Sequence, residues 1–421
     1  MRILFVSEST WMEGVVYDLH VMAEGLSLLG HEVYAIDPGL PLEPTEPQSK
    51  SVLKRSVSRV FPAAVVHLRT PRLPSLSSRF RIKRIRSLCY FYGAKQYLHE
   101  HFRRYVEINR FLAEETFDVI VLYSGVRSGF QTVLLARRHR IPVVFRNVDI
   151  LHNLWPTPVE CTLAKMMEKR VYPRVDMLLA LTPKYAEYLI RMGGDRSKVE
   201  LLVFPIDIEL FNSNSECLDL RARWGIRPSD KAIVFVGTLY EFSGLGDFIR
   251  KFPAVLKEVP EAKLVIVGDG PLRPSLDKIV DELNLRNHVA ITGYQPFADM
   301  PRYIGMATMC LNVFPITERT KDIFSAKIIQ YLACGKATVS SSLPGITTLI
   351  SSGVVYAENT DRMVEEVVSL LKSPEKRDLL GQAGRKYIED SHSHTKVILR
   401  LENALQRIVR NAGTERTGTA K

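Results

Sequence analysis

One short stretch of this chain combines residue types that can bind anions and hydroxyl groups. The segment DIFSAKIIQYLACG starts at Asp322, and a helix-like pattern begins near Ser325. Lys327 and Gln330 are three residues apart, so they share one face of the predicted helix. A lysine in a first turn is opposed by the helix dipole, and a bound anion would explain its position. The alternative is a lysine that is simply solvated.

Glycine turns elsewhere in the chain can present backbone N–H groups to the same kind of ligand. In VGTLYEFSGLGDFI a strand runs into a glycine turn at Gly237 and Thr238, and a helix follows Ser243. Such a turn can bind an anion at the helix N-terminus, but an ordinary strand-to-helix connection has the same pattern. The segment VIVGDGPLRPSL repeats this pattern, and its glycines more often serve chain turning than ligand contact.

The elements that must position these residues are alternating strands and helices. One series of short apolar runs is RILFVS, HEVYAID, DVIVLYSG, IPVVFRNVD, DMLLALT and VELLVFP. A second series is AIVFVGT, KLVIVGDG, HVAITGY, TMCLNVFP, ATVSSS and GVVYAE. Continuous apolar strands separated by helices are typical of parallel sheets that are buried on both faces. We therefore predict an α/β fold with two tandem Rossmann-like, doubly wound domains facing across a cleft.

The predicted domain boundaries follow from where the strand series restarts. The N-terminal domain is expected at 1–211 and the second domain at 212–390, beginning with a polar, linker-like stretch. A C-terminal helix at 391–410 is expected to pack back toward the N-terminal domain. The tail, 411–421, has almost no large apolar residues and is expected to be disordered.

Bulk composition is that of a soluble globular protein, with 46% hydrophobic and 24% charged residues among 421. No apolar run reaches the length of about 18 residues that would span a membrane, and the N-terminus is interpreted as a first strand. The five cysteines are scattered without a CxxC pair, which argues against a disulfide framework or a zinc site. We expect a cytoplasmic protein that needs no metal.

The net charge of +11 is concentrated in one segment. From Lys50 to Arg110 there are 15 lysines and arginines against two acids, with apolar residues between them. Prolines and serines predict mobile loops and short helices, rather than strands, from Lys50 to Arg86. This basic insertion, about 50–110, can contact the anionic inner face of a membrane. A solvated basic loop is the alternative, and no nucleic-acid motif accompanies the charge.

The order of these motifs resembles the retaining glycosyltransferases of the group 1, or family-4, kind, which have the GT-B fold. The resemblance rests on EGVVYDLHVMAEGLSLLGHEVYAID in the first half and FVGTLYEFSGL through DIFSAKIIQYLACGKATVSSSLPG in the second. It implies transfer of a sugar from a nucleoside-diphosphate donor, a substrate rather than a cofactor, with retention of configuration. The implied acceptor is a glycan or lipid-linked molecule in cell-surface polysaccharide or glycolipid synthesis.

The resemblance also implies roles for particular residues. Catalysis is assigned to Asp149, Lys327 and Asp322, and donor binding to Gly14, Gly237, Thr238, Ser243, Gly293, Tyr294, Asp322, Phe324, Ser325, Lys327 and Gln330. The family usually has two glutamates where this chain has Asp322 and Gln330. It often has an arginine and a lysine where this chain has Thr238 and Ser243. Lys327 is the best replacement for the missing cations.

Two further interpretations remain open from the sequence. Asp149 matches an expected His-Asp pair only in part, because His152 is displaced, and an Asp that caps the following turn is equally compatible. The departures at Thr238, Ser243 and Gln330 also fit a catalytically silent homologue that binds a nucleotide or glycan as a partner subunit. Epimerase chemistry is disfavoured, because no cluster of acids and histidines is evident.

Overall fold

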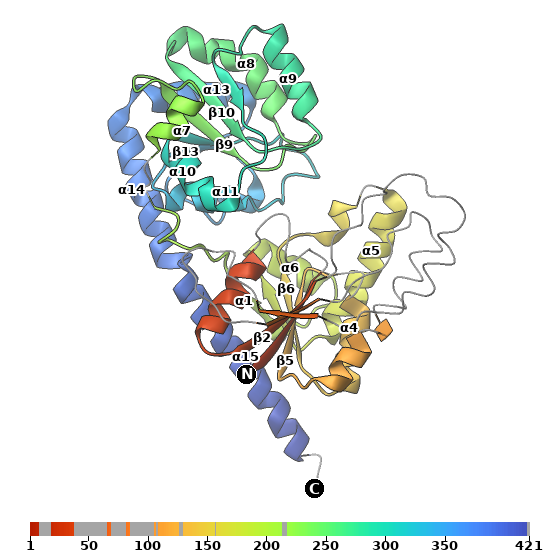
Figure 1. Ribbon diagram of the computed structural model, residues 1–421. Helices are drawn as coiled ribbons and strands as arrows, with labels where there is room; N and C mark the ends of the chain where they lie inside the picture. Colours follow the sequence, from red (N-terminus) through yellow and green to blue (C-terminus); the bar gives the residue numbers. More distant parts are fainter. Residues whose placement is uncertain are drawn as a thin grey trace, which may run out of the picture. The chain divides into compact units, whose positions relative to one another are not determined.

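The computed structural model forms two compact units, each an α/β fold (Figure 1). Residues 1–7, 18–37, 65–68, 81–84, 105–106, 108–125, 129–155, 157–212 and 217–418 are described. Unit 1 comprises Met1–Val203 and Ile398–Lys421, and unit 2 comprises Phe204–Val397. The chain therefore enters unit 2 after Val203 rather than after residue 211.

Unit 1 is built on an eight-stranded sheet with the strand order β3-β4-β2-β1-β5-β6-β7-β8. Its strands are β1 (Arg2–Ser7), β2 (Glu32–Asp37), β3 (Val65–Leu68), β4 (Arg81–Arg84), β5 (Val119–Tyr123), β6 (Val143–Asn147), β7 (Met177–Ala180) and β8 (Val199–Leu201). Its helices include α1 (Asp18–Leu28), α4 (Gly129–Arg138), α5 (Pro158–Val171) and α6 (Pro183–Arg191), with 3-10 turns η1 (Leu151–Leu154), η2 (Tyr172–Arg174) and η3 (Arg196–Lys198). All six strands predicted for this half are present.

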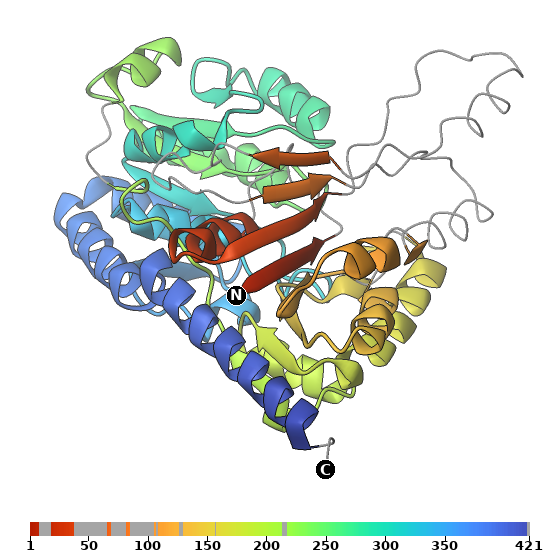
Figure 2. The same cartoon turned by 60° about the horizontal axis from the view of Figure 1, so that its bottom comes forward.

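Strands β3 and β4 correct one expectation. We predicted loops and short helices from Lys50 to Arg86, but β3 and β4 pair antiparallel, and β4 joins β2 in parallel at the edge of the sheet. Figure 2 shows this edge of the sheet. The sequence pattern missed these strands because each has only four residues and because three of the four in β4 are basic. The rest of the basic insertion lies mainly outside the described residues.

A long C-terminal helix, α15 (His394–Gly418), contributes its later turns to unit 1. The helix continues beyond residue 410, so the segment 411–418 is helical where a disordered tail was expected. Ile398 packs where a Cβ on Gly25 would stand, and His31 Nε2 and the Glu402 carboxylate are hydrogen-bonded at 2.7 Å. Arg407 also pairs with Glu200. These contacts tie the helix to α1 and to strand β8.

A buried ion pair joins α1 to the sheet of unit 1. The Arg146 guanidinium on β6 donates to Asp18 Oδ2 at 2.9 Å, and both side chains are almost fully buried. The Tyr123 hydroxyl donates to Asp18, and Arg146 also donates to the carbonyl oxygen of Leu202. A pair of this kind stabilises the fold only while both partners are present, because each charge has lost its water.

Unit 2 is built on a six-stranded parallel sheet with the order β11-β10-β9-β12-β13-β14. Its strands are β9 (Lys231–Val236), β10 (Ala262–Val267), β11 (Val289–Ile291), β12 (Met309–Asn312), β13 (Thr338–Ser341) and β14 (Val354–Ala357). Its helices are α7 (Leu218–Arg223), α8 (Leu245–Glu258), α9 (Arg273–Glu282), α10 (Met300–Gly305), α11 (Ala326–Ala333), α12 (Pro344–Thr347), α13 (Thr360–Lys372) and α14 (Pro374–Ser391), with a 3-10 turn η4 (Phe297–Asp299). This order is that of the doubly wound Rossmann fold.

The core of unit 2 has two layers because its strands are buried on both faces. Along β9, Ile233 and Phe235 pack with α8, α9 and α13, whereas Ala232, Val234 and Val236 pack with α10 and α11. Figure 1 shows α8 and α9 on one side of the sheet and α10 and α11 on the other. In such a sheet the strand order reverses between β9 and β12, and ligands bind at the carboxyl ends next to this reversal.

Candidate functional site

The carboxyl ends of β9 and β12 bring together two of the predicted turns in unit 2. The turn after β9 contains Gly237, Thr238 and Ser243, and Gly244 at its end packs against Val313 beyond β12. Helix α11 begins beside these turns at the same edge of the sheet. The site described below lies entirely within unit 2.

Lys327 is the central cation of this edge. Its ammonium lies 3.9 Å from the centroid of the Phe235 ring and 5.3 Å from that of Phe314. A Cβ on Gly237 would stand 2.9 Å from the same nitrogen. Within the described part of the chain, no acceptor or acid pairs with it. Part of the side chain is exposed, but burial of the ammonium lowers the pKa of Lys327 to about 7.

The N-terminus of α11 is held by a buried polar network. Ser325 occupies the N-cap position, but its hydroxyl donates to Asn312 Oδ1 at 2.7 Å and does not cap the helix. Asn312 in turn donates to Ser340 Oγ at 2.8 Å. This network fixes the start of the helix against β12 and β13. The first N–H groups of α11 therefore lack a side-chain cap, which suits an external anion.

Close backbone packing explains the glycines of the first two turns. Gly268, at φ +153°, approaches Gly237 so closely that a Cβ would overlap the Gly237 carbonyl oxygen. Gly270 packs in the same way against Leu239. The VGDG segment therefore serves the contact between the turns after β9 and β10, as the chain-turning interpretation expects.

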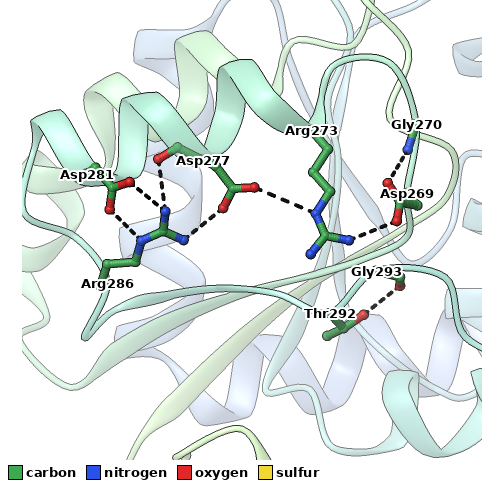
Figure 3. Close-up of polar contacts among 8 residues, drawn as sticks. All are labelled: Asp269, Gly270, Arg273, Asp277, Asp281, Arg286, Thr292 and Gly293. Carbon is green, nitrogen blue, oxygen red and sulfur yellow. Dashed lines mark hydrogen bonds and ion pairs between the residues drawn. The ribbon is translucent and has the colours of Figure 1, made fainter.

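Gly293 lies on the next turn along the edge, at φ +74°, a left-handed conformation that favours glycine. Gly268 and Gly293 form an isolated bridge, and a Cβ on Gly293 would stand 2.8 Å from Arg273 Nη1. Figure 3 shows Arg273 between Asp269 and Asp277, facing this turn. Two carboxylates compensate the guanidinium charge. Arg273 is therefore part of a surface network of paired charges.

The remaining predicted donor residues lie around this edge. Thr238 is partly exposed, and Ser243 is buried with no hydrogen-bond partner for its hydroxyl among the described residues. Asp322 lies before α11, where its backbone rests against Gly345 of α12. Gln330 follows Lys327 by one turn of α11, and Tyr294 is exposed after β11.

Phe324 has a different neighbour from the other donor candidates. The centroid of its ring lies 6.1 Å from the centroid of the Phe204 ring, and Phe204 is the first residue of unit 2. Gly14 lies outside the described residues, so its predicted role in donor binding stays a prediction.

Aromatic residues at this edge were missed from the sequence. Phe242 stacks between Tyr240 and Phe314, with centroid distances of 5.0 and 6.4 Å. The Arg319 guanidinium lies 5.0 Å from the centroid of Phe242. The rings under Lys327 and Arg319 hold cations by cation–π attraction. The sequence did carry a signal for these rings. Phe235 in FVG and Phe314 in VFP each stand next to a turn that follows a strand.

Asp149 lies in unit 1, just after β6. Its Oδ1 accepts from the backbone N–H of Ile150 at 2.8 Å and from Tyr185 at 3.5 Å. Burial, the largest cause, raises the pKa of Asp149 to about 6. The 3-10 turn η1 that follows begins after Ile150 and has no side-chain cap, so Asp149 does not cap it, and its catalytic role stays a prediction.

His152 is held by a buried carboxylate beside Asp149. Its Nδ1 lies 2.8 Å from Glu168 Oε2 and 3.0 Å from the Tyr188 hydroxyl. Glu168 is buried and also accepts from the hydroxyls of Tyr172 and Tyr188, each at 2.8 Å. The displaced histidine is thus oriented by residues of α5, η2 and α6 that sequence spacing did not connect with it.

Comparison with known proteins supplies the family. Residues 13–204 match the model described as "Glycosyl transferase 4-like domain", and residues 230–373 match "Glycosyl transferases group 1". The first range lies almost entirely in unit 1, and the second lies within unit 2. The chain belongs to the group 1 glycosyltransferases with the GT-B fold.

Similar proteins include enzymes that are named for lipid products and acceptors. Alpha-monoglucosyldiacylglycerol synthase of Acholeplasma laidlawii is 23% identical over 395 residues, which cover 89% of each chain. A GDP-mannose-dependent alpha-(1-6)-phosphatidylinositol monomannoside mannosyltransferase of Mycobacterium tuberculosis is 23% identical and covers 67% of this chain and 74% of its own. The crystal structure of Anabaena HepE in complex with UDP-glucose matches with a TM-score of 0.67 at 14% identity, covering 97% of this chain and 100% of its own.

Proposed function

We propose that this glycosyltransferase transfers a sugar from a nucleoside-diphosphate donor with retention of anomeric configuration. The observation that carries the proposal is Lys327, whose ammonium pairs with no acid among the described residues and lies at the carboxyl ends of β9 and β12. A diphosphate leaving group needs positive charge as its bond to the sugar breaks. The usual arginine and lysine positions hold Thr238 and Ser243, so this role falls to Lys327 and to backbone N–H groups.

In the proposed reaction the residues of unit 2 bind and orient the donor. Lys327 and the N-terminus of α11 would hold the diphosphate, while Asp322 and Gln330 would accept hydrogen bonds from sugar and ribose hydroxyls. The bond between the anomeric carbon and the diphosphate oxygen breaks as the acceptor oxygen bonds to the same face of that carbon. The departing diphosphate takes the acceptor's proton, so no protein nucleophile is required.

The proposed acceptor is a glycan or a lipid-linked molecule of cell-surface polysaccharide or glycolipid synthesis. The names of two relatives, which contain a diacylglycerol and a phosphatidylinositol, support a lipid acceptor. In the described ranges, no helix has the length and apolarity needed to cross a membrane. Contact with an anionic membrane surface through the basic insertion from Lys50 to Arg110 stays a prediction, because most of that segment lies outside the described residues.

A donor panel tests the proposal directly. Purified protein is mixed with UDP-, GDP-, ADP- and CMP-sugars, and thermal stabilisation and slow donor hydrolysis are both measured. Stabilisation by one donor together with its hydrolysis is expected. Stabilisation without hydrolysis, even with membrane extract as acceptor, would favour a silent binding subunit, for which Thr238, Ser243 and Gln330 argue. No response to any nucleotide would contradict the transferase and would leave only a glycan-binding subunit.

Donor binding should weaken as the pH rises. Because the pKa of Lys327 in the free protein is about 7, most molecules carry a neutral amine at pH 8. A bound diphosphate must then first draw a proton onto Lys327, so the association constant should fall by up to about tenfold per pH unit above 7. Calorimetric titration with the best nucleoside diphosphate between pH 6 and 9 measures this slope. A Lys327→Arg variant, which stays charged, should lose the slope, and an equal slope in both proteins would contradict the assignment.

A further inference from the structure

Helix α5 of unit 1 presents an apolar stripe to solvent. Val159, Leu163 and Met166 are 69%, 52% and 44% exposed. Their spacing of four and three residues places them on one face of the helix. The opposite face, with Ala164 and Glu168, is buried. Single exposed apolar residues are ordinary, but a continuous stripe on one helix face is a candidate contact surface.

Basic residues flank this stripe without acidic partners. Lys165, Lys169 and Arg170 are exposed, and among the residues described here none of them pairs with a carboxylate. The two acids of α5 are otherwise engaged. Glu160 accepts from the Thr157 hydroxyl at 2.7 Å, and Glu168 is buried beneath the helix with its tyrosine and histidine partners. The outward face of α5 is therefore both apolar and positively charged.

More positive charge gathers at the C-terminal end of the same helix. Arg174 donates to the carbonyl oxygen of Arg170 at 2.8 Å, and Arg137 of α4 donates to that of Arg174 at 3.2 Å. Helix α4 contains no acidic residue. The helix dipole favours cations at a helix C-terminus. These arginines are not needed there to neutralise a carboxylate.

We propose that α5 docks unit 1 onto an anionic lipid surface. An interfacial helix places its apolar side chains at the boundary of the acyl chains, while lysines and arginines extend to the lipid phosphates. Val159, Leu163 and Met166 supply the first part of this pattern. Lys165, Lys169 and Arg170 supply the second. An anionic bilayer offers lipid phosphates next to an apolar acyl layer, so one surface matches both parts of the pattern.

This surface is independent of the donor site, which lies in unit 2. It also differs from the basic insertion between Lys50 and Arg110. Membrane binding through α5 therefore does not depend on nucleotide binding, and either property can fail alone in an experiment.

Vesicle sedimentation with the full chain tests the proposal. Vesicles of phosphatidylglycerol and phosphatidylcholine are compared with vesicles of phosphatidylcholine alone at low salt. The wild-type protein should bind the anionic vesicles, and Leu163→Glu/Met166→Glu should lower the partition coefficient at least about tenfold. The matched control is Leu218→Glu/Leu379→Glu in unit 2, where the leucines are 77% and 69% exposed. This control should bind like the wild type.

A second variant separates charge from apolar contact. Replacing Lys165, Lys169 and Arg170 with glutamine should lower the partition coefficient roughly fivefold for each charge removed. This reduction should become smaller as salt is added. Unchanged melting temperatures would show that the variants fold. The proposal is overturned if wild-type protein ignores anionic vesicles, or if both α5 variants bind as well as the control. In the second case, a segment other than α5 makes the contact.

Discussion

Replacing Lys327 with alanine should lower the rate of sugar transfer, or of donor hydrolysis, by about 100- to 1000-fold. Removing one preorganised group that stabilises developing charge costs this much in enzymes where it has been measured. The effect should be large here because no second cation occupies the turn after β9, where Thr238 and Ser243 stand. The measurement is kcat with the donor identified in the panel.

The same substitution should not damage the fold. Burial holds the pKa of Lys327 near 7 in the folded protein, below the ordinary value of 10.5. Unfolded chains therefore bind more protons between these values, and this lysine makes the protein less stable as the pH falls through that range. Alanine should leave the melting temperature at pH 7 unchanged or higher. A loss of activity with a lower melting temperature would instead indicate a structural role.

Lys321 provides the matched control for this experiment. It lies in the loop before α11, is partly exposed, and forms an ion pair with Glu318. A Lys321→Ala variant should keep wild-type kcat, because its charge is already paired and screened by water. Equal losses in the two variants would mean that the loop, rather than the Lys327 charge, matters.

Breaking the buried pair in unit 1 should cause the largest loss of stability. An Asp18→Leu variant leaves the Arg146 guanidinium buried without its carboxylate. Removing one partner of such a pair typically costs about 3–5 kcal/mol in the free energy of unfolding. Urea denaturation followed by circular dichroism measures it. The Tyr123 hydroxyl, which donates to Asp18, would also lose its acceptor.

A double variant tests whether the cost comes from the unpaired charge. Asp18→Leu/Arg146→Met removes both charges and should recover much of the lost stability, because apolar replacements of buried pairs are often neutral. As a surface control, Asp219→Asn breaks the exposed pair with Arg302 and should cost no more than about 1 kcal/mol. If the double variant is as unstable as Asp18→Leu, packing rather than charge explains the loss.

Most of the fold was predictable because the strands are buried on both faces. Runs such as VIVLY of β5 and AIVFV of β9 are continuously apolar, and few other structures accommodate that pattern. All twelve predicted strands are present, in two sheets with helices between them. Strands β3 and β4 were missed because each has four residues and, in β4, three are basic. The extra turns of α15 were missed because their composition is polar.

The sequence by itself determined the fold class, the family and the position of Lys327 in the first turn of a helix. These properties depend on local pattern and on the order of segments along the chain. Only the tertiary structure decided what surrounds that lysine. The rings of Phe235 and Phe314 and the close approach of Gly237 come from segments far apart in the sequence.

The tertiary structure alone also decided the partner of His152 and the outward position of the apolar stripe on α5. The contact of His152 with Glu168 joins two elements that no spacing rule connects. In α5, the sequence shows apolar residues on more than one face, and only packing decides which face is buried. Burial and partner choice are properties of contacts between distant segments, so they could not be derived from the pattern of residues along the chain.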